Sequence, residues 1–303
     1  MRTDLRPLDF GEILDTTIRL LRTGWKPLFL TGLISAIPVV LYNGVTLSLT
    51  PTPATMETST SGLFFRAIIG AESGDFTQLF ELGGILVFLV LFMLLVNVWT
   101  SSTLIVLASR LYLGLPVTAG MAMRIAGRRY FAILGTGLLK LLFLIIAVPV
   151  LVIGGLVFLA IFTVPVGLVV LSVFLTFTTV VLVVENAGGG WPAIQRSFRL
   201  VGGRFWPLLG LSIIFYLFAS VLSGQLAAIT QLPAQLLRTF NQNPDFAPAL
   251  AWIVAVFSGL LTAFTMPLNY VGVTLAYYDT RMRKEGLDLE IMAAGQVTGA
   301  HDA

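Results

Sequence analysis

One apolar run, residues 131–184, has the sequence FAILGTGLLKLLFLIIAVPVLVIGGLVFLAIFTVPVGLVVLSVFLTFTTVVLVV. It is 54 residues long, and Lys140 is its only charged residue. A helix needs about 20 apolar residues to cross the hydrocarbon of a bilayer. The run is therefore too long for one crossing and predicts two, at 131–156 and 161–184, joined by a tight turn. The candidate helix breakers at this turn are Gly154, Gly155, Pro165 and Gly167.

The rest of the chain has the same apolar character. Of its 303 residues, 57% are hydrophobic and only 11% are charged, and the mean hydropathy is +0.94. A soluble domain has about 25% charged residues. Four further apolar segments have the length of a span. The sequence thus predicts an all-α integral membrane protein, one domain over 1–303 with six spans and a tail at 281–303. The remaining four spans are expected at 26–50, 82–109, 206–230 and 249–278.

Lysine and arginine residues lie almost entirely on one side of these six spans. Arg66 and Arg238 are the two that fall on the other side. Positive charge near span ends resists translocation and so marks the cytoplasmic side. We therefore expect both termini in the cytoplasm, with outer loops at 51–81 and 231–248.

The composition argues against several kinds of function. There is no cysteine, and the single histidine, His301, is the third residue counted from the end of the sequence. Thiolate chemistry, a histidine triad and a Cys or His metal site are therefore not expected, and neither is a cofactor. The net charge is +3, but its basic residues cluster at span ends, which favours anionic lipid headgroups over nucleic acid as the partner.

Three cytoplasmic segments resemble one another: LDFGEILDTTIRLLRTGWKPLFL from Leu8, PVTAGMAMRIAGRRYFAIL from Pro116 and WPAIQRSFRLVGGRFWPLL from Trp191. Fixed-period similarity of this kind indicates an internal repeat. Aligning their central arginines also superposes one aromatic residue from each segment, and the 75-residue spacing of the last two copies places Arg110 on Glu185. The aligned residues are Arg19, Arg124 and Arg199, followed by Trp25, Tyr130 and Phe205.

Each copy predicts a cytoplasmic amphipathic helix followed by a two-span hairpin. In the first copy Asp9 and Glu12 have the spacing of a capping box, so we expect the helix to start there. The third copy has Pro192 at a first-turn position. Such helices lie in the membrane interface with cations toward the headgroups. The expected apolar faces are Phe10, Ile13, Leu14, Ile18 and Leu21, then Met121 and Ile125, then Trp191, Ile194, Phe198 and Val201.

Three separated blocks of the sequence resemble one family. They are RPLDFGEILDTTIRLLR, VVENAGGGWPAIQRSFRLVGGRFWPLLG and YYDTRMRKEGLDLE. The blocks are similar to the bacterial membrane domain of membrane-anchored glycerophosphoryl diester phosphodiesterases. The resemblance implies a multi-pass protein of the bacterial cytoplasmic membrane. The catalytic barrel of that family, with its His-Arg-Gly signature, has no counterpart in this sequence, so the resemblance implies a stand-alone membrane domain.

A few polar residues lie within or at the ends of the predicted spans, where ionisable groups are costly and mark candidate sites. Lys140 is either an anion or lipid-phosphate contact, a partner for Glu185 or Asp279, or a lysine that reaches back to the interface. Glu185 and Asp279 are either an ion site or form ion pairs and helix caps. Asn97 and Asn269 are either part of a polar site or bond neighbouring helices.

The aligned Arg19, Arg124 and Arg199 are candidate lipid-phosphate contacts, and the alternative is that they only anchor interfacial helices. Our leading hypothesis is a non-catalytic membrane module that acts as an anchor, scaffold or regulatory partner of another protein. The alternative is a transporter, channel or lipid-handling protein with a polar cavity between hairpins. A lipid-active enzyme would have to rely on Glu185 and Asp279 alone.

Overall fold

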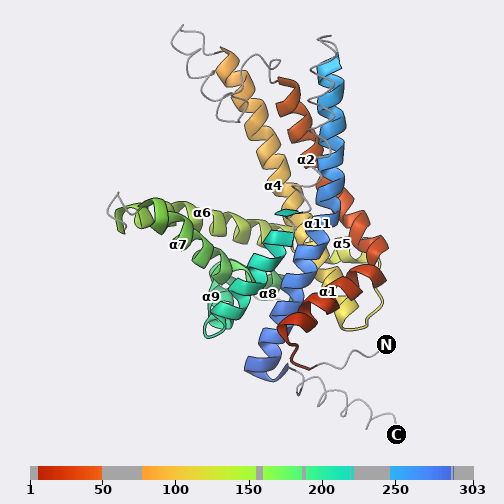
Figure 1. Cartoon of the computed structure of the whole chain (residues 1–303), viewed down its shortest axis with the longest axis vertical. Coiled ribbons are helices and arrows are strands. Elements are labelled where there is room, and N and C mark those ends of the chain that lie inside the picture. Colours follow the sequence, from red (N-terminus) through yellow and green to blue (C-terminus); the bar gives the residue numbers. More distant parts are fainter. Residues whose placement is uncertain are drawn as a thin grey trace. The chain divides into compact units, whose positions relative to one another are not determined.

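The structure is a computed structural model that describes residues 6–49, 77–154, 160–185, 189–218, 220–221, 246–287 and 289. The described residues are helical apart from short turns (Figure 1). The predicted outer loops at 51–81 and 231–248 lie mostly outside this part of the chain, as do His301 and most of the tail. The helices are α1 (Phe10–Thr23), α2 (Trp25–Leu49), α4 (Thr77–Tyr112), α5 (Ala119–Gly127), α6 (Tyr130–Gly154), α7 (Ala160–Leu175), α8 (Thr178–Val184), α9 (Trp191–Val201) and α11 (Phe246–Glu285).

Five of the described helical stretches are long and apolar enough to cross a membrane. They lie at Trp25–Val45, Val87–Tyr112, Tyr130–Gly154, Phe162–Val184 and Trp252–Glu285. A sixth is present if α9 and the helix Phe205–Phe218, which meet at an angle of 102°, are counted together. The described part of the chain is therefore all-helical, with the candidate spans of a multi-pass membrane protein. The predicted span at 206–230 is described only up to 218 and at 220–221.

The contacts within the chain divide it into two compact units, and the one domain expected over 1–303 stays a prediction. Unit 1 comprises Met1–Leu28, Val98–Leu217 and Met266–Ala303, and unit 2 comprises Phe29–Asn97 and Phe218–Thr265. The long helices α2, α4 and α11 contribute residues to both units. Because continuous helices pass from one unit to the other, no change of composition marks the division in the sequence.

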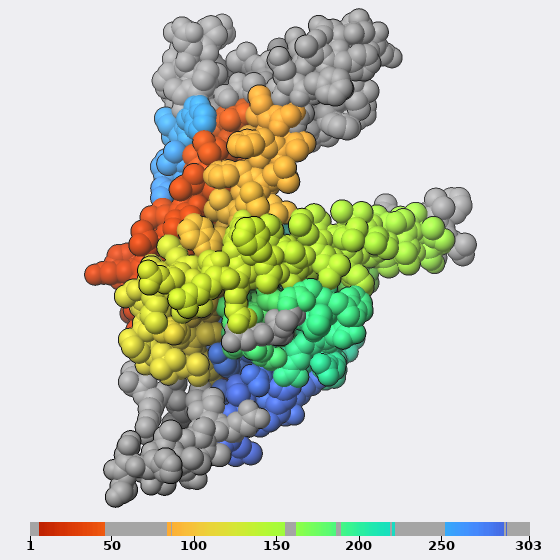
Figure 2. Space-filling model, turned by 180° about the vertical axis from the view of Figure 1, so that it is seen from behind, coloured from red at the N-terminus to blue at the C-terminus, as the bar shows by residue number. Residues whose placement is uncertain are grey.

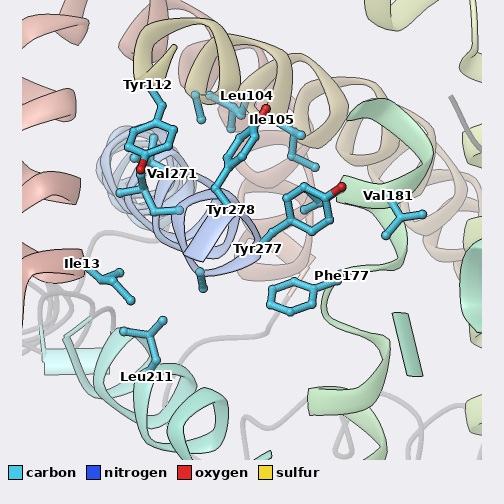
Figure 3. Close-up of a cluster of buried hydrophobic side chains, with 14 of the residues drawn as sticks. Ile13, Leu104, Ile105, Tyr112, Phe177, Val181, Leu211, Val271, Tyr277 and Tyr278 are labelled. Carbon is cyan, nitrogen blue, oxygen red and sulfur yellow. The ribbon is translucent and has the colours of Figure 1, made fainter. Parts of the chain in front are cut away.

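The core of unit 1 is built around α4, α8 and α11. Leu104, Phe177 and Tyr277 are fully buried there, and the rings of Phe177 and Tyr277 meet edge to face with centroids 5.8 Å apart (Figure 3). Aromatic pairs in this geometry stabilise a core beyond their area alone. The three short helices α1, α5 and α9 each add buried residues to the same cluster. The core is thus made by helix ends that are far apart in the sequence.

The first short helix begins as the sequence predicts. The side chain of Glu12 accepts a hydrogen bond from the backbone N–H of Asp9 at 2.9 Å, which confirms the capping box. Its buried side differs from the expected apolar face, because it includes Thr16 and Thr17 while Ile18 is 53% exposed. The Thr17 hydroxyl is satisfied within the helix by the carbonyl of Ile13, at 2.7 Å. A small hydroxyl residue can therefore replace an apolar residue in this contact.

The hairpin of α6 and α7 corrects one prediction. Pro165 and Gly167 lie inside α7, so their assignment as helix breakers is wrong, whereas α6 is described up to Gly154 and Gly155 lies outside the described residues. A Cβ on Gly167 would lie 2.6 Å from methyl carbons of Leu151 in α6. The glycine thus permits a close approach of the two helices, and proline is tolerated within membrane helices. The space-filling view shows α6 uncovered along its length (Figure 2), and residues such as Phe131 and Ile153 are 82% and 75% exposed.

Unit 2 is held by close helix packing between α2 and α11. A Cβ on Gly32 would overlap the backbone of Ala263, and one on Gly259 would lie 3.4 Å from the Cβ of Ala36. Both helices thus present two small residues four positions apart. Asn43 donates a hydrogen bond to Ser258 at 2.8 Å in the same pair. Small residues let helix backbones approach closely, which is a common way of packing helices in membranes.

Candidate functional site

Unit 1 contains a cluster of charged residues at the C-terminal end of α8. Glu185 follows α8 directly and accepts hydrogen bonds from Arg196 of α9, at 3.0 and 3.2 Å, and from the hydroxyl of Tyr277, at 2.6 Å. Arg196 also donates to Glu285 at 2.7 Å, and Arg281 donates to Glu285 at 2.8 Å. Two carboxylates therefore share two guanidinium groups in a partly buried network. It joins α8, α9 and the end of α11.

A second cluster surrounds Asp279, whose side chain is only 3% exposed. Its carboxylate accepts hydrogen bonds from Arg204 at 2.8 Å, Arg283 at 2.9 Å and the backbone N–H of Leu8 at 2.9 Å. Arg283 also donates to the carbonyl of Leu8 at 2.8 Å. A buried carboxylate is costly unless it is paired and hydrogen-bonded. Asp279 meets this condition and fixes the segment before α1 against α11.

The N-terminus of α1 adds an exposed acidic residue to this region. Glu12 forms an ion pair with Arg6 and accepts the N–H of Asp9. The hydrogen bond from the Asp9 backbone, followed by the one from Arg6, lowers the pKa of Glu12 below its usual value. A carboxylate that accepts such bonds is favoured in its charged form.

A cavity of about 220 Å³ opens beside Asp279. Its walls come from the start of α1, the helix Phe205–Phe218 and α11, and all the residues that line it belong to unit 1. Figure 3 shows the side chains of Ile13 and Leu211, on the first two of these helices, turned toward one another. The charged residues of its lining are Arg204, Arg283, Asp279 and the exposed Asp9. The other residues of the lining are apolar, so the cavity combines apolar walls with two guanidinium groups and two carboxylates.

The structure does not bring the sequence candidates together as one polar site. Glu185 is paired with Arg196 and Arg281, whereas Asp279 is paired with Arg204 and Arg283. The predicted pairing of Lys140 with either carboxylate is therefore not found.

The other candidates are not members of either cluster. Lys140 is half-buried on α6 and forms no ion pair within the described residues. Asn269 lies exposed on the unit 1 part of α11, and Asn97 belongs to unit 2.

The three aligned arginines are all exposed. Arg19, Arg124 and Arg199 lie on α1, α5 and α9, and none forms an ion pair with a carboxylate in the part of the chain that is described. Arg19 donates a hydrogen bond to Thr16 of its own helix at 3.2 Å. They remain candidate contacts for lipid phosphate.

Several residues of the two clusters were not among the sequence candidates: Arg196, Arg204, Arg283, Tyr277 and Glu285. Two signals in the sequence point to some of them. Asp279 and Arg283, like Arg281 and Glu285, are four residues apart on one helix, a spacing at which opposite charges meet. The contact of Leu8 with Asp279 joins positions 271 residues apart and has no local signal.

These features define the class of protein as a multi-pass helical membrane protein with an internal ion-pair network. Among the described residues, no group of His, Cys, Asp and Glu side chains has the arrangement of a metal site. No protein-family model matches the sequence, and comparisons with curated proteins and with solved structures give no match either. The resemblance to the phosphodiesterase membrane domain therefore stays a prediction.

Proposed function

We propose that the chain is a non-catalytic integral membrane module that serves as an anchor, scaffold or regulatory partner for another protein. The observation that carries the proposal is that the carboxylates of both clusters are paired with arginines. Glu185 and Asp279 are each bound by two arginines, and Glu285 shares Arg196 and Arg281. A carboxylate that exchanges protons or ions needs to be accessible to them, whereas these groups are engaged in joining helices.

The architecture that we propose is a threefold repeat of a short cytoplasmic helix and a membrane hairpin. The start points of three helices support it. The helices that follow α1, α5 and α9 begin at Trp25, Tyr130 and Phe205, which are the aromatic residues that superpose when the central arginines are aligned.

Burial at aligned positions also supports the repeat. Each short helix has a small residue on its buried side, two positions before its arginine in the sequence. These residues are Thr17, Ala122 and Ser197, and the exposed fraction of each is 0%. A small residue at this position lets the helix lie close to the core.

Contacts at the 75-residue spacing give independent support. Arg110 at the end of α4 lies 3.4 Å from the sulfur of Met121 in α5, and the aligned pair is Glu185 and Arg196. The two aligned positions are therefore in contact in both the second and the third copy. The contact is between arginine and methionine in the second copy and between glutamate and arginine in the third. The resemblance to the bacterial phosphodiesterase membrane domain fits this architecture and adds the cytoplasmic membrane of a bacterium as the proposed location.

The orientation, with both termini in the cytoplasm, has a direct test because the chain has no cysteine. Single cysteines at Thr58 and at Arg128 would lie in the predicted outer loop and on the predicted cytoplasmic side. In intact cells an impermeant maleimide should label only the variant at position 58, and position 128 should react after permeabilisation. The reverse pattern would overturn the orientation.

The scaffold function is tested by purifying the chain from mild detergent and quantifying the proteins that come with it. A variant with Arg19→Gln, Arg124→Gln and Arg199→Gln changes the exposed faces of all three short helices. The matched control carries Arg22→Gln, Arg128→Gln and Lys26→Gln, which are exposed and give the same charge change. We expect a stoichiometric partner with the native chain and the control, and its loss with the first variant. Purification of the chain without any stoichiometric partner would contradict the proposal.

The transporter or channel alternative has less support. It requires Lys140, Glu185, Asp279, Asn97 and Asn269 to line one polar cavity, and the cavity beside Asp279 is lined by none of the other four. Uptake of a solute into proteoliposomes, abolished by Lys140→Met, would favour it over the scaffold.

A further inference from the structure

We propose that the cavity beside Asp279 binds one glycerophospholipid with a singly charged headgroup, with its phosphodiester on Arg204 and Arg283. The cavity measures about 220 Å³, far more than the roughly 10–15 Å³ that one water molecule requires. It lies in unit 1 and does not depend on whether the chain acts as a scaffold.

The apolar walls of the cavity can accommodate part of an acyl chain or the glycerol of a lipid. Leu8, Phe10, Ile13, Pro207 and Leu211 contribute apolar surface to the cavity, and Phe10 is 41% exposed although it is a large aromatic residue. Exposed apolar surface beside a membrane is compatible with contact to lipid chains. An apolar cavity with a few convergent polar groups is the usual form of a ligand site.

The two arginines of the cavity still have hydrogen-bond donors to offer. Arg204 uses one terminal nitrogen on Asp279, and Arg283 uses its Nε on Asp279 and one terminal nitrogen on Leu8. A guanidinium carries five N–H donors in a planar fork that suits phosphate oxygens. Both side chains are partly exposed, at 21% and 37%, so these donors can be reached.

The charges favour a singly charged headgroup. Arg204 and Arg283 contribute two positive charges and Asp279 one negative charge, which leaves one positive charge at the cavity. Asp9 also lies at the cavity, but its side chain is 92% exposed and 3.9 Å from Arg283, so water weakens its effect. A phosphodiester with one negative charge would balance the site, whereas a zwitterionic phosphatidylcholine would add a positive group beside two arginines.

The test is native mass spectrometry of the delipidated full chain with added phosphatidylglycerol or phosphatidylcholine. We expect one phosphatidylglycerol to bind, about tenfold more tightly than phosphatidylcholine. Equal affinity for the two lipids would overturn the proposal. Soluble glycerophosphoglycerol is added as a competitor, to distinguish binding of the headgroup alone from binding of the whole lipid. If it binds as tightly as the lipid, the site recognises a free phosphodiester and the proposed occupant is wrong.

Two variants locate the binding. Arg283→Gln keeps a donor for Asp279 but removes a charge, and we expect it to weaken phosphatidylglycerol binding about tenfold. Phe10→Ala removes apolar wall without a charge change and should weaken binding of the lipid but not of the soluble headgroup.

The matched control is Arg128→Gln, an exposed arginine directly after α5 that does not line the cavity. We expect it to bind phosphatidylglycerol as the native chain does. If Arg128→Gln and Arg283→Gln lose the same affinity, the lipid is attracted by overall surface charge and the proposed site is wrong. Thermal unfolding of each variant in detergent verifies that the chains compared are folded.

Discussion

In unit 1 the helix ends are joined by charges, whereas in unit 2 α2 and α11 are joined by small residues. Asp279 connects α11 to Arg204 and to the backbone of Leu8, and it also pairs with Arg283 of its own helix. In unit 2 the corresponding role falls to Gly32 and Ala263, whose backbones are in direct contact. One chain therefore uses two kinds of helix packing. Ion pairs hold the helices together where arginines and carboxylates are close to one another. Close approach of the backbones holds them together where the helices are apolar.

The largest expected effect is in unit 1. Asp279→Ala leaves Arg204, Arg283 and the N–H of Leu8 without their acceptor, and breaking a buried pair in this way costs about 3–5 kcal/mol. We expect a large drop in the unfolding temperature of the purified protein in detergent. The control is Asp15→Ala, since Asp15 is exposed on α1. Equal stability of the two variants would mean that Asp279 does not hold the helices together.

A smaller effect is expected from the hydrogen bond between Tyr277 and Glu185. Tyr277→Phe removes the O–H donor while the ring stays in the core, and a hydrogen bond to a charged group contributes about 1.5–3 kcal/mol. The free energy of unfolding in denaturant measures the loss. Tyr216→Phe is the control, because Tyr216 is 72% exposed. A loss no greater than that of the control would show that the bond at 2.6 Å is not important for stability.

In unit 2 the expected effect of Gly32→Ala is somewhat smaller. Its Cβ would overlap the backbone of Ala263. Overpacking costs about 1–3 kcal/mol, and the higher helix propensity of alanine offsets roughly 0.5–1 kcal/mol of it. The control is Gly84→Ala, since no atom of the described part of the chain lies within 4 Å of a Cβ at Gly84, and this change should not destabilise. If both variants are equally stable, the close packing of unit 2 does not contribute as described.

The smallest expected effect is the contribution of Glu12 to stability, which depends on pH. Because its folded-state pKa is lowered, its contribution to stability is present above the ordinary value of 4.5 and is lost as the pH falls through the lower folded-state pKa. Glu12→Gln should therefore lower the unfolding temperature slightly at pH 7. The difference from the native chain should shrink toward zero in acid. A difference that does not change with pH would contradict the assigned bonds to Asp9 and Arg6.

The sequence predicts the membrane helices well where composition alone decides. The run at 131–184 accounts for two of the candidate spans, Tyr130–Gly154 and Phe162–Val184. Pro165 and Gly167 mislead because proline and glycine break helices in water but have packing roles in membranes. Only the structure shows that Gly167 contacts Leu151.

Of the candidate site, the sequence predicts the two carboxylates but not the residues that pair with them. Glu185 and Asp279 stand out because carboxylates at span ends are rare, so the sequence identifies them. Their partners depend on contacts between distant segments, such as the bond from Leu8 to Asp279, which no local pattern contains. The burial of Thr17 instead of a larger apolar residue likewise depends on how closely α1 approaches the core.

The most direct test of the central claim, that the charged residues of unit 1 join helices, is a double-mutant cycle of Glu185→Gln and Arg196→Gln. The free energy of unfolding is measured for the native chain, each single variant and the double variant. We predict a coupling of about 0.5–3 kcal/mol, with the double variant less destabilised than the sum of the singles. Additive effects, within about 0.3 kcal/mol, would contradict the claim that this pair holds α8 and α9 together.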